Sequence, residues 1–342
     1  MKKIAIISMA LLLVILSACS TPKENSSPVA AATNTPASEA PQQTKAPEAA
    51  SDIKATENEL TLENDGVNEE EFLKALEQFP GQPVEKIATT SVPLTEMLYL
   101  LGITPVGVPT STNPIPAAFD SVTRIGSPMA PDLEVVTDIE PELLLGAESL
   151  RSTLEKNLEG LDLKTAYLKT DSFNDLKLSF KVLGTYFNKQ EEMNKVLSSI
   201  LAKENELMKA AEGKQLPKAM LMIGTSDSFM VMSESSYLGS LVSLLGADNI
   251  ATSLLKVTST YSAINLEDIL VADPDIIFVL ASGDHGANQE KFEQEVAKND
   301  AWTKLSAYKN DNIHILDYSI FGVTSISNAE KALTTISDYF FK

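Results

Sequence analysis

Cysteine is almost absent from this sequence: Cys19 is the only one in 342 residues. A single thiol cannot form an intrachain disulfide, and it cannot supply the thiolate clusters of structural zinc sites. The sequence also lacks the His-Glu-x-x-His pair of zinc hydrolases and the Gly-x-Ser-x-Gly elbow of serine hydrolases. With no evident nucleophile or acid–base pair, we predict that the protein is not an enzyme.

Positive charge is also scarce. The chain has 27 Lys and Arg against 47 Asp and Glu, and its only arginines are Arg124 and Arg151. A nucleic-acid partner needs many cationic side chains along its phosphates, so we expect no nucleic-acid partner. The same scarcity leaves few guanidinium groups to bind the carboxylates of an anionic ligand.

One long apolar run lies near the N-terminus. Lys2 and Lys3 precede apolar residues 4–16, a run too short for a typical membrane span and typical of a secretory signal. The sequence Leu16-Ser17-Ala18-Cys19 is similar to the cleavage site of bacterial lipoproteins, in which the cysteine receives a lipid. An ordinary secretory peptide with an incidental cysteine is the alternative. We expect lipid attachment at Cys19 and a location on the extracellular face of the cell membrane.

The rest of the chain changes composition several times. Residues after Cys19 are rich in Pro, Ala, Ser and Thr and cannot bury a core, which favours a flexible tether. An acidic stretch follows, with one amphipathic helical pattern at residues 69–78 that could either pack on the body or extend from it. The expected organisation is a signal peptide (1–18), a tether (19–56), an acidic extension with a short helix (57–82), an N-lobe (83–171), linking helices (172–213) and a C-lobe (214–342).

Short apolar strands alternate with helical patterns in both expected lobes, which predicts an α/β fold with mainly parallel sheets. Residues 189–211 contain no Gly or Pro and match one helix of about six turns. A core helix of one large domain would show the same pattern. We favour two similar Rossmann-like lobes joined by a long backbone helix. Strands are expected at 85–89, 104–108, 143–146, 165–169, 219–223, 229–232, 276–280 and 313–316, and residues 109–128 are expected to form a loop.

An internal repeat supports two lobes of like topology. Residues 132–149, DLEVVTDIEPELLLGAES, align without a gap with residues 265–282, NLEDILVADPDIIFVLAS. Helix-to-strand units are common in α/β proteins, so chance similarity is the alternative. The repeat places Glu134 and Glu267 at equivalent positions in the first turn of a helix. An acid there is also favoured by the helix dipole alone.

Two residues are candidate metal ligands. Met129 lies between Pro128 and Pro131, which stiffen its segment, and His285 follows a buried strand at the edge where α/β sheets bind ligands. A thioether and a neutral imidazole suit haem iron better than zinc. The alternatives are that Met129 fills a gap between lobes and that His285 is a loop residue without a ligand. The other histidine, His314, lies in an apolar strand and is expected to be structural.

From Ile87 to Lys342 the chain resembles haem-binding, substrate-binding lipoproteins of bacterial ABC importers, within a group that also carries siderophores and cobalamin. The motifs that carry the resemblance are Ile87-Ala88-Thr89-Thr90, Gly126-Ser127-Pro128-Met129, residues 236–246, Pro274-Asp275-Ile276-Ile277, Asn299-Asp300-Ala301-Trp302 and Phe321-Gly322-Val323-Thr324.

The resemblance implies a ligand cleft between two α/β lobes. It also implies that Met129 and His285 are the axial ligands of haem b, and that Glu134 and Glu267 contact arginines of the permease. These implications predict a monomeric, lipid-anchored receptor that delivers haem to an ABC permease, with an upstream haem-donor surface protein as a further candidate partner.

The haem propionates need hydrogen-bond donors, and we assign part of that role to backbone N–H groups at a helix start formed by Thr90, Ser91 and Val92. Three alternatives compete with a haem receptor. The first is a receptor for a ferric siderophore or cobalamin, which a chain with one Trp and two Arg favours less. The others are an extracellular enzyme on the same fold and a lipoprotein that binds only proteins.

Overall fold

The structure, a computed structural model, describes residues 59–224, 229–281 and 285–341, without the side chains of residues 285–289, 291 and 295. The expected signal peptide, Cys19 and the tether therefore lie outside the described residues. Within the described ranges, the longest helices are too polar to cross a membrane. The two lobes belong to one compact unit, which spans Ala55–Lys342.

The N-lobe is built on a five-stranded parallel sheet in the order β3-β2-β1-β4-β5. The two central strands, β1 and β4, are buried along their whole length, as parallel strands covered on both faces must be. The strands are β1 (Ile87–Thr89), β2 (Gly107–Val108), β3 (Thr123–Arg124), β4 (Leu143–Ala147) and β5 (Thr165–Leu168). The sequence predicts only a loop where β3 forms, because this exposed two-residue strand shows no hydrophobic alternation.

Successive residues of β1 and β4 face opposite sides of the sheet, and each side has its own helices. Ile87 and Leu143 join a core that contains residues of α2, whereas Ala88 and Leu144 join a core that contains residues of α3 and α4. These helices are α2 (Val92–Leu100), α3 (Leu133–Ile139) and α4 (Arg151–Asn157).

The C-lobe sheet is mixed, with the order β11-β10-β6-β7-β9 and β8 paired to β6. β7 runs antiparallel to β6 and to β9, so this edge departs from the mainly parallel arrangement that holds for the other strand pairs of both sheets. Only residues 225–228 separate β6 from β7, whereas a parallel return needs a crossover of about a dozen residues. The strands are β6 (Lys218–Gly224), β7 (Phe229–Met232), β8 (Asp248–Asn249), β9 (Tyr261–Ala263), β10 (Ile276–Ala281) and β11 (Ile313–Leu316).

Helices cover both faces of the C-lobe sheet. α7 and α13 contribute to the core on one face, while α8, α9 and α10 contribute to the core on the other. Among these elements, α8, α11 and α12 are single turns that are too short to show a helical period in sequence. The helices are α7 (Tyr237–Leu244), α8 (Ile250–Ser253), α9 (Leu266–Ala272), α10 (His285–Lys298), α11 (Ser306–Lys309), α12 (Tyr318–Phe321) and α13 (Ala329–Phe341).

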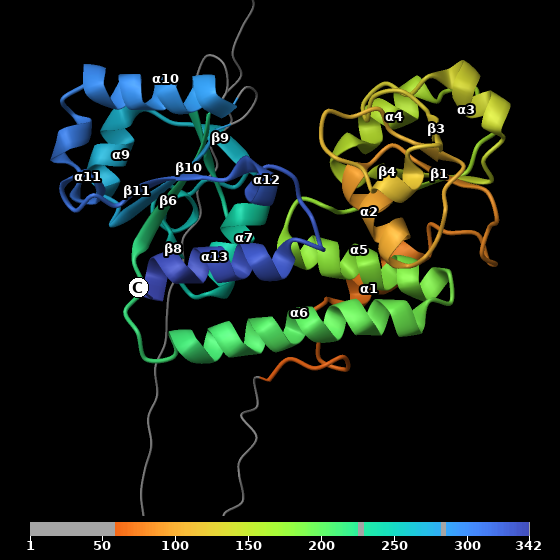
Figure 1. The fold of residues 1–342 in the computed structure, drawn as a ribbon, viewed down its shortest axis with the longest axis horizontal. Helices are drawn as coiled ribbons and strands as arrows, with labels where there is room; N and C mark the ends of the chain where they lie inside the picture. The colour runs from red at the N-terminus through yellow and green to blue at the C-terminus, as the bar shows by residue number, and fades with distance from the viewer. Residues whose placement is uncertain (1–58, 225–228, 282–284, 342) are drawn as a thin grey trace, which may run out of the picture. The chain divides into compact units, whose positions relative to one another are not determined.

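Two long helices connect the lobes, as Figure 1 shows. α5 (Phe173–Tyr186) begins at a capping box formed by Ser172 and Asp175, and it packs on α2 of the N-lobe and α7 of the C-lobe. α6 (Gln190–Ala211) is a 22-residue helix that packs on α5 and on α13. The prediction of a single long helix in this region is therefore confirmed, and the largest core is shared by both lobes.

The internal repeat corresponds to real structural equivalence at the ends of α3 and α9. Asp132 caps the N-terminus of α3 and Asn265 caps that of α9, each through a side-chain oxygen. Both helices end at a left-handed residue, Glu140 with φ 46° and Asp273 with φ 40°. Asp132 is aligned with Asn265, and Glu140 with Asp273, in the two repeats. Both units therefore turn from helix to strand in the same way.

The equivalence continues into the strands. Glu142 accepts a 2.8 Å hydrogen bond from the backbone N–H of Lys86, just before β1. Asp275, its aligned partner, accepts a 2.9 Å bond from the N–H of Lys218 at the start of β6. Each carboxylate thus joins the beginnings of two central strands, which supports two lobes of like construction.

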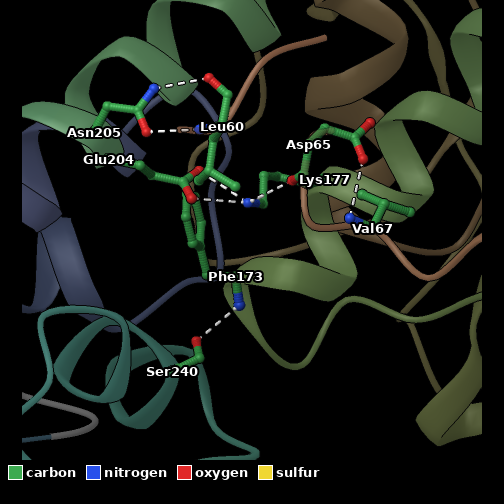
Figure 2. A network of polar contacts seen from close by, with 8 residues as sticks. All are labelled: Leu60, Asp65, Val67, Phe173, Lys177, Glu204, Asn205 and Ser240. Atoms are coloured by element: carbon green, nitrogen blue, oxygen red, sulfur yellow. Dashed lines mark hydrogen bonds and ion pairs between the residues drawn. The ribbon is translucent and has the colours of Figure 1, made fainter. Parts of the chain in front are cut away.

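The acidic extension packs on the linking helices, which the sequence left open. α1 (Glu69–Leu76) packs on α5 and buries Phe72. Further upstream, Leu60 donates its N–H to Asn205 of α6 at 2.9 Å and accepts from the amide of the same side chain at 2.8 Å. Figure 2 shows this paired contact, in which one asparagine side chain bonds to both the N–H and the carbonyl of Leu60.

A buried ion pair lies beneath the extension. Lys177 of α5 and Glu204 of α6 have side chains 1% and 0% exposed, and Nζ donates to both carboxylate oxygens at 2.9 Å. The same ammonium donates to the carbonyl of Asp65 at 3.2 Å (Figure 2). Burial raises the pKa of Glu204, and Lys177 opposes that shift. The extension therefore supplies one of the hydrogen-bond acceptors for the buried Lys177 ammonium.

Candidate functional site

A cavity of about 910 Å³ lies between the two lobes. Its volume falls within the range of about 300–1,000 Å³ that is usual for small-molecule sites. The N-lobe wall is formed by α2 and by residues 112–116. The C-lobe wall is formed by Ala281 at the end of β10, by residues 315–319 and by part of the segment 323–328.

The topology explains why these segments meet. α2 begins after the carboxyl end of β1, while α12 begins after that of β11, and ligands of open α/β sheets bind beyond these ends. The two lobes present these edges to a common space. The cavity is therefore where the architecture predicts a ligand.

The helix start at Thr90, Ser91 and Val92 is only partly available to a ligand. The N–H of Thr90 donates to the carbonyl of Leu145 at 2.9 Å, and that of Ser91 donates to Thr89 Oγ1 at 3.0 Å. Of the three residues assigned from sequence, Val92 lines the cavity, whereas Thr90 and Ser91 are buried within the N-lobe. Both of those N–H groups already have partners, so they are poor propionate donors.

Met129 lies on a tightly held turn. Gly126 and Pro131 form a bridge, Ala130 donates its N–H to Ser127 Oγ at 3.1 Å, and Asn157 donates to the carbonyl of Met129 at 2.7 Å. Gly126 has φ +93°, and a Cβ there would approach a backbone nitrogen to 2.7 Å, so glycine is required.

The turn holds its backbone while leaving the side chain accessible. Met129 is 57% exposed and is not among the residues that line the cavity. The structure therefore agrees with a turn that presents the Met129 thioether to solvent. That this thioether also reaches the cavity stays a prediction.

The two histidines lie in different settings. His285 is the first residue of α10, shortly after Ala281 of the cavity wall, and its side chain is outside the described residues. Its role therefore stays a prediction. His314 lies in β11 with its ring 4.5 Å from that of Tyr339, and Nε2 lies 2.8 Å from Asn312 Oδ1. Burial lowers the pKa of His314, as in a packed structural residue.

Glu134 and Glu267 occupy equivalent and accessible positions. Glu134 lies in the first turn of α3 and Glu267 in the first turn of α9, and both are exposed. Figure 1 shows one of these helices in each lobe. The pair could therefore contact a partner that bridges the two lobes.

Glu96 is a cavity residue that sequence reasoning missed. It is the one charged residue of α2, and its carboxylate bonds to residues of the opposite lobe: Ser325 Oγ at 2.8 Å and the N–H of Ile326 at 3.0 Å. The available signal was a single acid in a helix that has no other charged residue. Its partners lie more than two hundred positions away in sequence, so the contact itself had no local signature.

The described lining of the cavity contains acids, hydroxyl groups and apolar side chains, but no Lys or Arg. Glu96 and Asp317 are its acidic members. Across the described residues, no group of three or more His, Cys, Asp or Glu is arranged to hold a metal ion. A bound ligand would thus meet apolar side chains, neutral polar groups and two acids on the described walls.

Comparison with known proteins identifies the family. Residues 87–319 match the family described as "Periplasmic binding protein". IsdE, a high-affinity heme uptake system protein of Staphylococcus aureus, is 33% identical over 262 residues, covering 75% of this chain and 87% of IsdE. The crystal structure of IsdE complexed with heme superposes with a TM-score of 0.68 at 30% identity and covers 75% of this chain and 99% of that one.

Other structures share the fold. An ABC transporter substrate-binding protein from Listeria monocytogenes EGD-e superposes with a TM-score of 0.69 at 31% identity, covering 76% of this chain and 99% of that one. FeuA from Bacillus subtilis, complexed with ferri-bacillibactin, has a TM-score of 0.61 at 24% identity, with 76% and 94% covered, and shows the fold alone. The chain therefore belongs to the periplasmic binding protein family, whose members resembling it are substrate-binding proteins of transporters and not enzymes.

Proposed function

We propose that this protein is a lipid-anchored, cell-surface receptor that binds haem b and delivers it to an ABC permease. The observation that carries the proposal is 33% identity to a heme uptake protein over 75% of the chain. The cavity between the lobes supports the proposal, because its volume falls in the range that is usual for small-molecule sites. Cys19 would carry the lipid, and an upstream surface protein is the candidate haem donor.

In this proposal Met129 of the N-lobe and His285 of the C-lobe coordinate the haem iron. The turn from Gly126 to Pro131 holds the Met129 backbone and leaves its side chain accessible, which suits a ligand that must meet an incoming metal. The sulfur of methionine favours reduced iron. Val92 remains the best-placed member of the expected α2 start to contact the ligand.

Haem and ferric siderophores make different demands on the cavity. Ferric catecholate siderophores carry high negative charge, whereas the described cavity walls offer acids and no Lys or Arg. Haem buries a large apolar surface and has only two carboxylates. The charge of the described walls therefore favours haem over a ferric catecholate siderophore.

A ligand titration tests the proposal. We expect purified protein to bind haem saturably at one site, with a shifted and intensified visible absorbance, because iron ligation changes the electronic environment of the porphyrin. Equilibrium dialysis against a ferric catecholate siderophore and against cobalamin provides the comparison. Saturable uptake of either of these ligands without saturable uptake of haem would contradict the proposal.

Permease docking through Glu134 and Glu267 gives a second test. We expect Glu134→Lys with Glu267→Lys to lower haem uptake by cells at least about tenfold, because opposite charges across an interface become like charges. Haem binding by the purified double variant should stay unchanged, since both residues are exposed and outside the cavity lining.

The matched control is Glu159→Lys with Glu212→Lys, which makes the same change in net charge at two other exposed positions. This control variant should retain normal uptake. Equal loss of uptake in both double variants would show that net charge, rather than docking, is responsible.

A further inference from the structure

We propose that Glu96 is a latch between the lobes, a positioning residue that fixes the separation of the two cavity walls. Glu96 lies on α2 in the N-lobe and lines the cavity. Its carboxylate accepts hydrogen bonds from Ser325 Oγ, from the N–H of Ile326 and from Ser327 Oγ, all in the C-lobe. The contact thus joins the opposing walls directly.

Both oxygens of the Glu96 carboxylate take part in this contact. Ser325 and Ser327 both donate to Oε1, while Ile326 donates to Oε2, so both carboxylate oxygens bond to the opposite lobe. Bonds to an ionised acceptor are stronger than bonds between neutral groups. Separating the lobes would leave a half-buried charge to be solvated inside the cavity.

The donors are themselves held rigidly. Tyr237, a buried residue of α7, donates its hydroxyl to the carbonyl of Ser325 at 3.1 Å. The Oγ of Ser325 accepts the N–H of Asn328 at 3.1 Å, at the start of α13. Burial raises the pKa of Tyr237, and the neighbouring charge of Glu96 raises it further. The hydroxyl therefore stays protonated and can donate. The latch therefore closes on a fixed part of the C-lobe.

A contact between the linking helix α5 and the C-lobe helps to explain the role of Glu96. The N–H of Phe173, at the start of α5, donates to Ser240 Oγ of α7 at 2.8 Å (Figure 2). That bond lies where the linking helix begins, whereas Glu96 bonds at the cavity wall. The bonds of Glu96 therefore restrain the two lobes at the cavity wall as well.

The primary test measures the distance between lobes in the ligand-free protein. Spin labels are attached at Lys156→Cys and Lys331→Cys, two exposed sites in different lobes, in the full chain with Cys19→Ser. Pulsed electron paramagnetic resonance should give one narrow distance distribution for this protein. Glu96→Ala should broaden the distribution and move its mean, because no acceptor remains for the three C-lobe donors.

Two further variants keep the test decisive. Ser327→Ala removes one donor at an exposed position, so it should fold normally and broaden the distribution to a smaller extent. Glu159→Ala removes an exposed N-lobe carboxylate and should change nothing. A distribution as narrow in Glu96→Ala as in the Glu159→Ala control would overturn the latch, and so would broadening in that control.

A ligand measurement links the latch to binding, and this arm rests on the proposed function. Haem should leave Glu96→Ala about tenfold faster than the unmodified protein, while the absorbance of bound haem stays the same because Glu96 is not an iron ligand. An unchanged release rate would remove the link to binding. Failure of the protein to bind haem would overturn the proposed function but leave the distance test intact.

Discussion

Lys177→Met is expected to lower the free energy of unfolding by about 3–5 kcal/mol, because it leaves an unpaired charge in the interior. Glu204 is fully buried, and both of its oxygens accept from Lys177. The carbonyl of Asp65 would lose the same donor. Chemical unfolding followed by circular dichroism measures the change.

The stability loss in Lys177→Met should depend on pH in a defined direction. Without the ammonium, burial and the neighbouring charge of Asp65 hold the pKa of Glu204 above its unfolded value, so the folded state disfavours the carboxylate. The resulting destabilisation is complete above the folded pKa. It should decrease as pH falls through that pKa and disappear below the unfolded pKa of about 4.3, where both states are protonated.

Two variants separate the buried charge from general damage to α5 and α6. Lys177→Met with Glu204→Leu removes both charges, so it should be much more stable than the single variant and near the unmodified protein. Lys203→Met breaks a partly exposed pair with Glu206 and should cost less than about 1 kcal/mol. A double variant no more stable than Lys177→Met would show that the charge imbalance is not the cause.

Met129→Ala is expected to weaken haem binding at least roughly tenfold and to alter the visible spectrum of the bound haem. Loss even of a residue that supports a metal ligand costs about 10- to 100-fold in affinity, and an axial ligand should matter at least as much. His285→Ala should have a comparable effect. The folded protein should keep its stability in Met129→Ala, because the side chain is 57% exposed.

Leu133→Ala is the matched control for this loop, since Leu133 is also an exposed apolar residue just beyond the same turn. It should leave both affinity and spectrum unchanged. An unchanged spectrum in both Met129→Ala and His285→Ala would remove the iron-ligand assignment. Equal weakening in Leu133→Ala would instead indicate a general effect of the loop surface.

Much of the fold could be predicted from local sequence. Strands such as β10 are continuous apolar runs, and α6 has an apolar period of three to four residues without Gly or Pro. The repeat also indicates the equivalence of Glu134 and Glu267 through a direct alignment of two segments. The strand and helix patterns depend on residues close together in the chain and the repeat needs only an alignment, so the sequence alone determined them.

Short elements depended on tertiary contacts. β3 and β8 have two residues each and are stabilised by partner strands. β7 pairs antiparallel with β6 in a sheet whose other central pairs are parallel. A two-residue strand buries too little to produce a pattern of its own. Its existence depends on backbone hydrogen bonds to a strand formed elsewhere in the chain.

The sequence by itself determined two similar α/β lobes, a long connecting helix and a methionine on a stiff turn, because periodicity, glycine and proline act locally. Only the tertiary structure decided that the extension packs over Lys177 and Glu204, and that Glu96 bonds across the cavity to Ser325. Those contacts join residues distant in sequence. Their energy depends on burial and on the distance between charges, which exist only after the chain has folded.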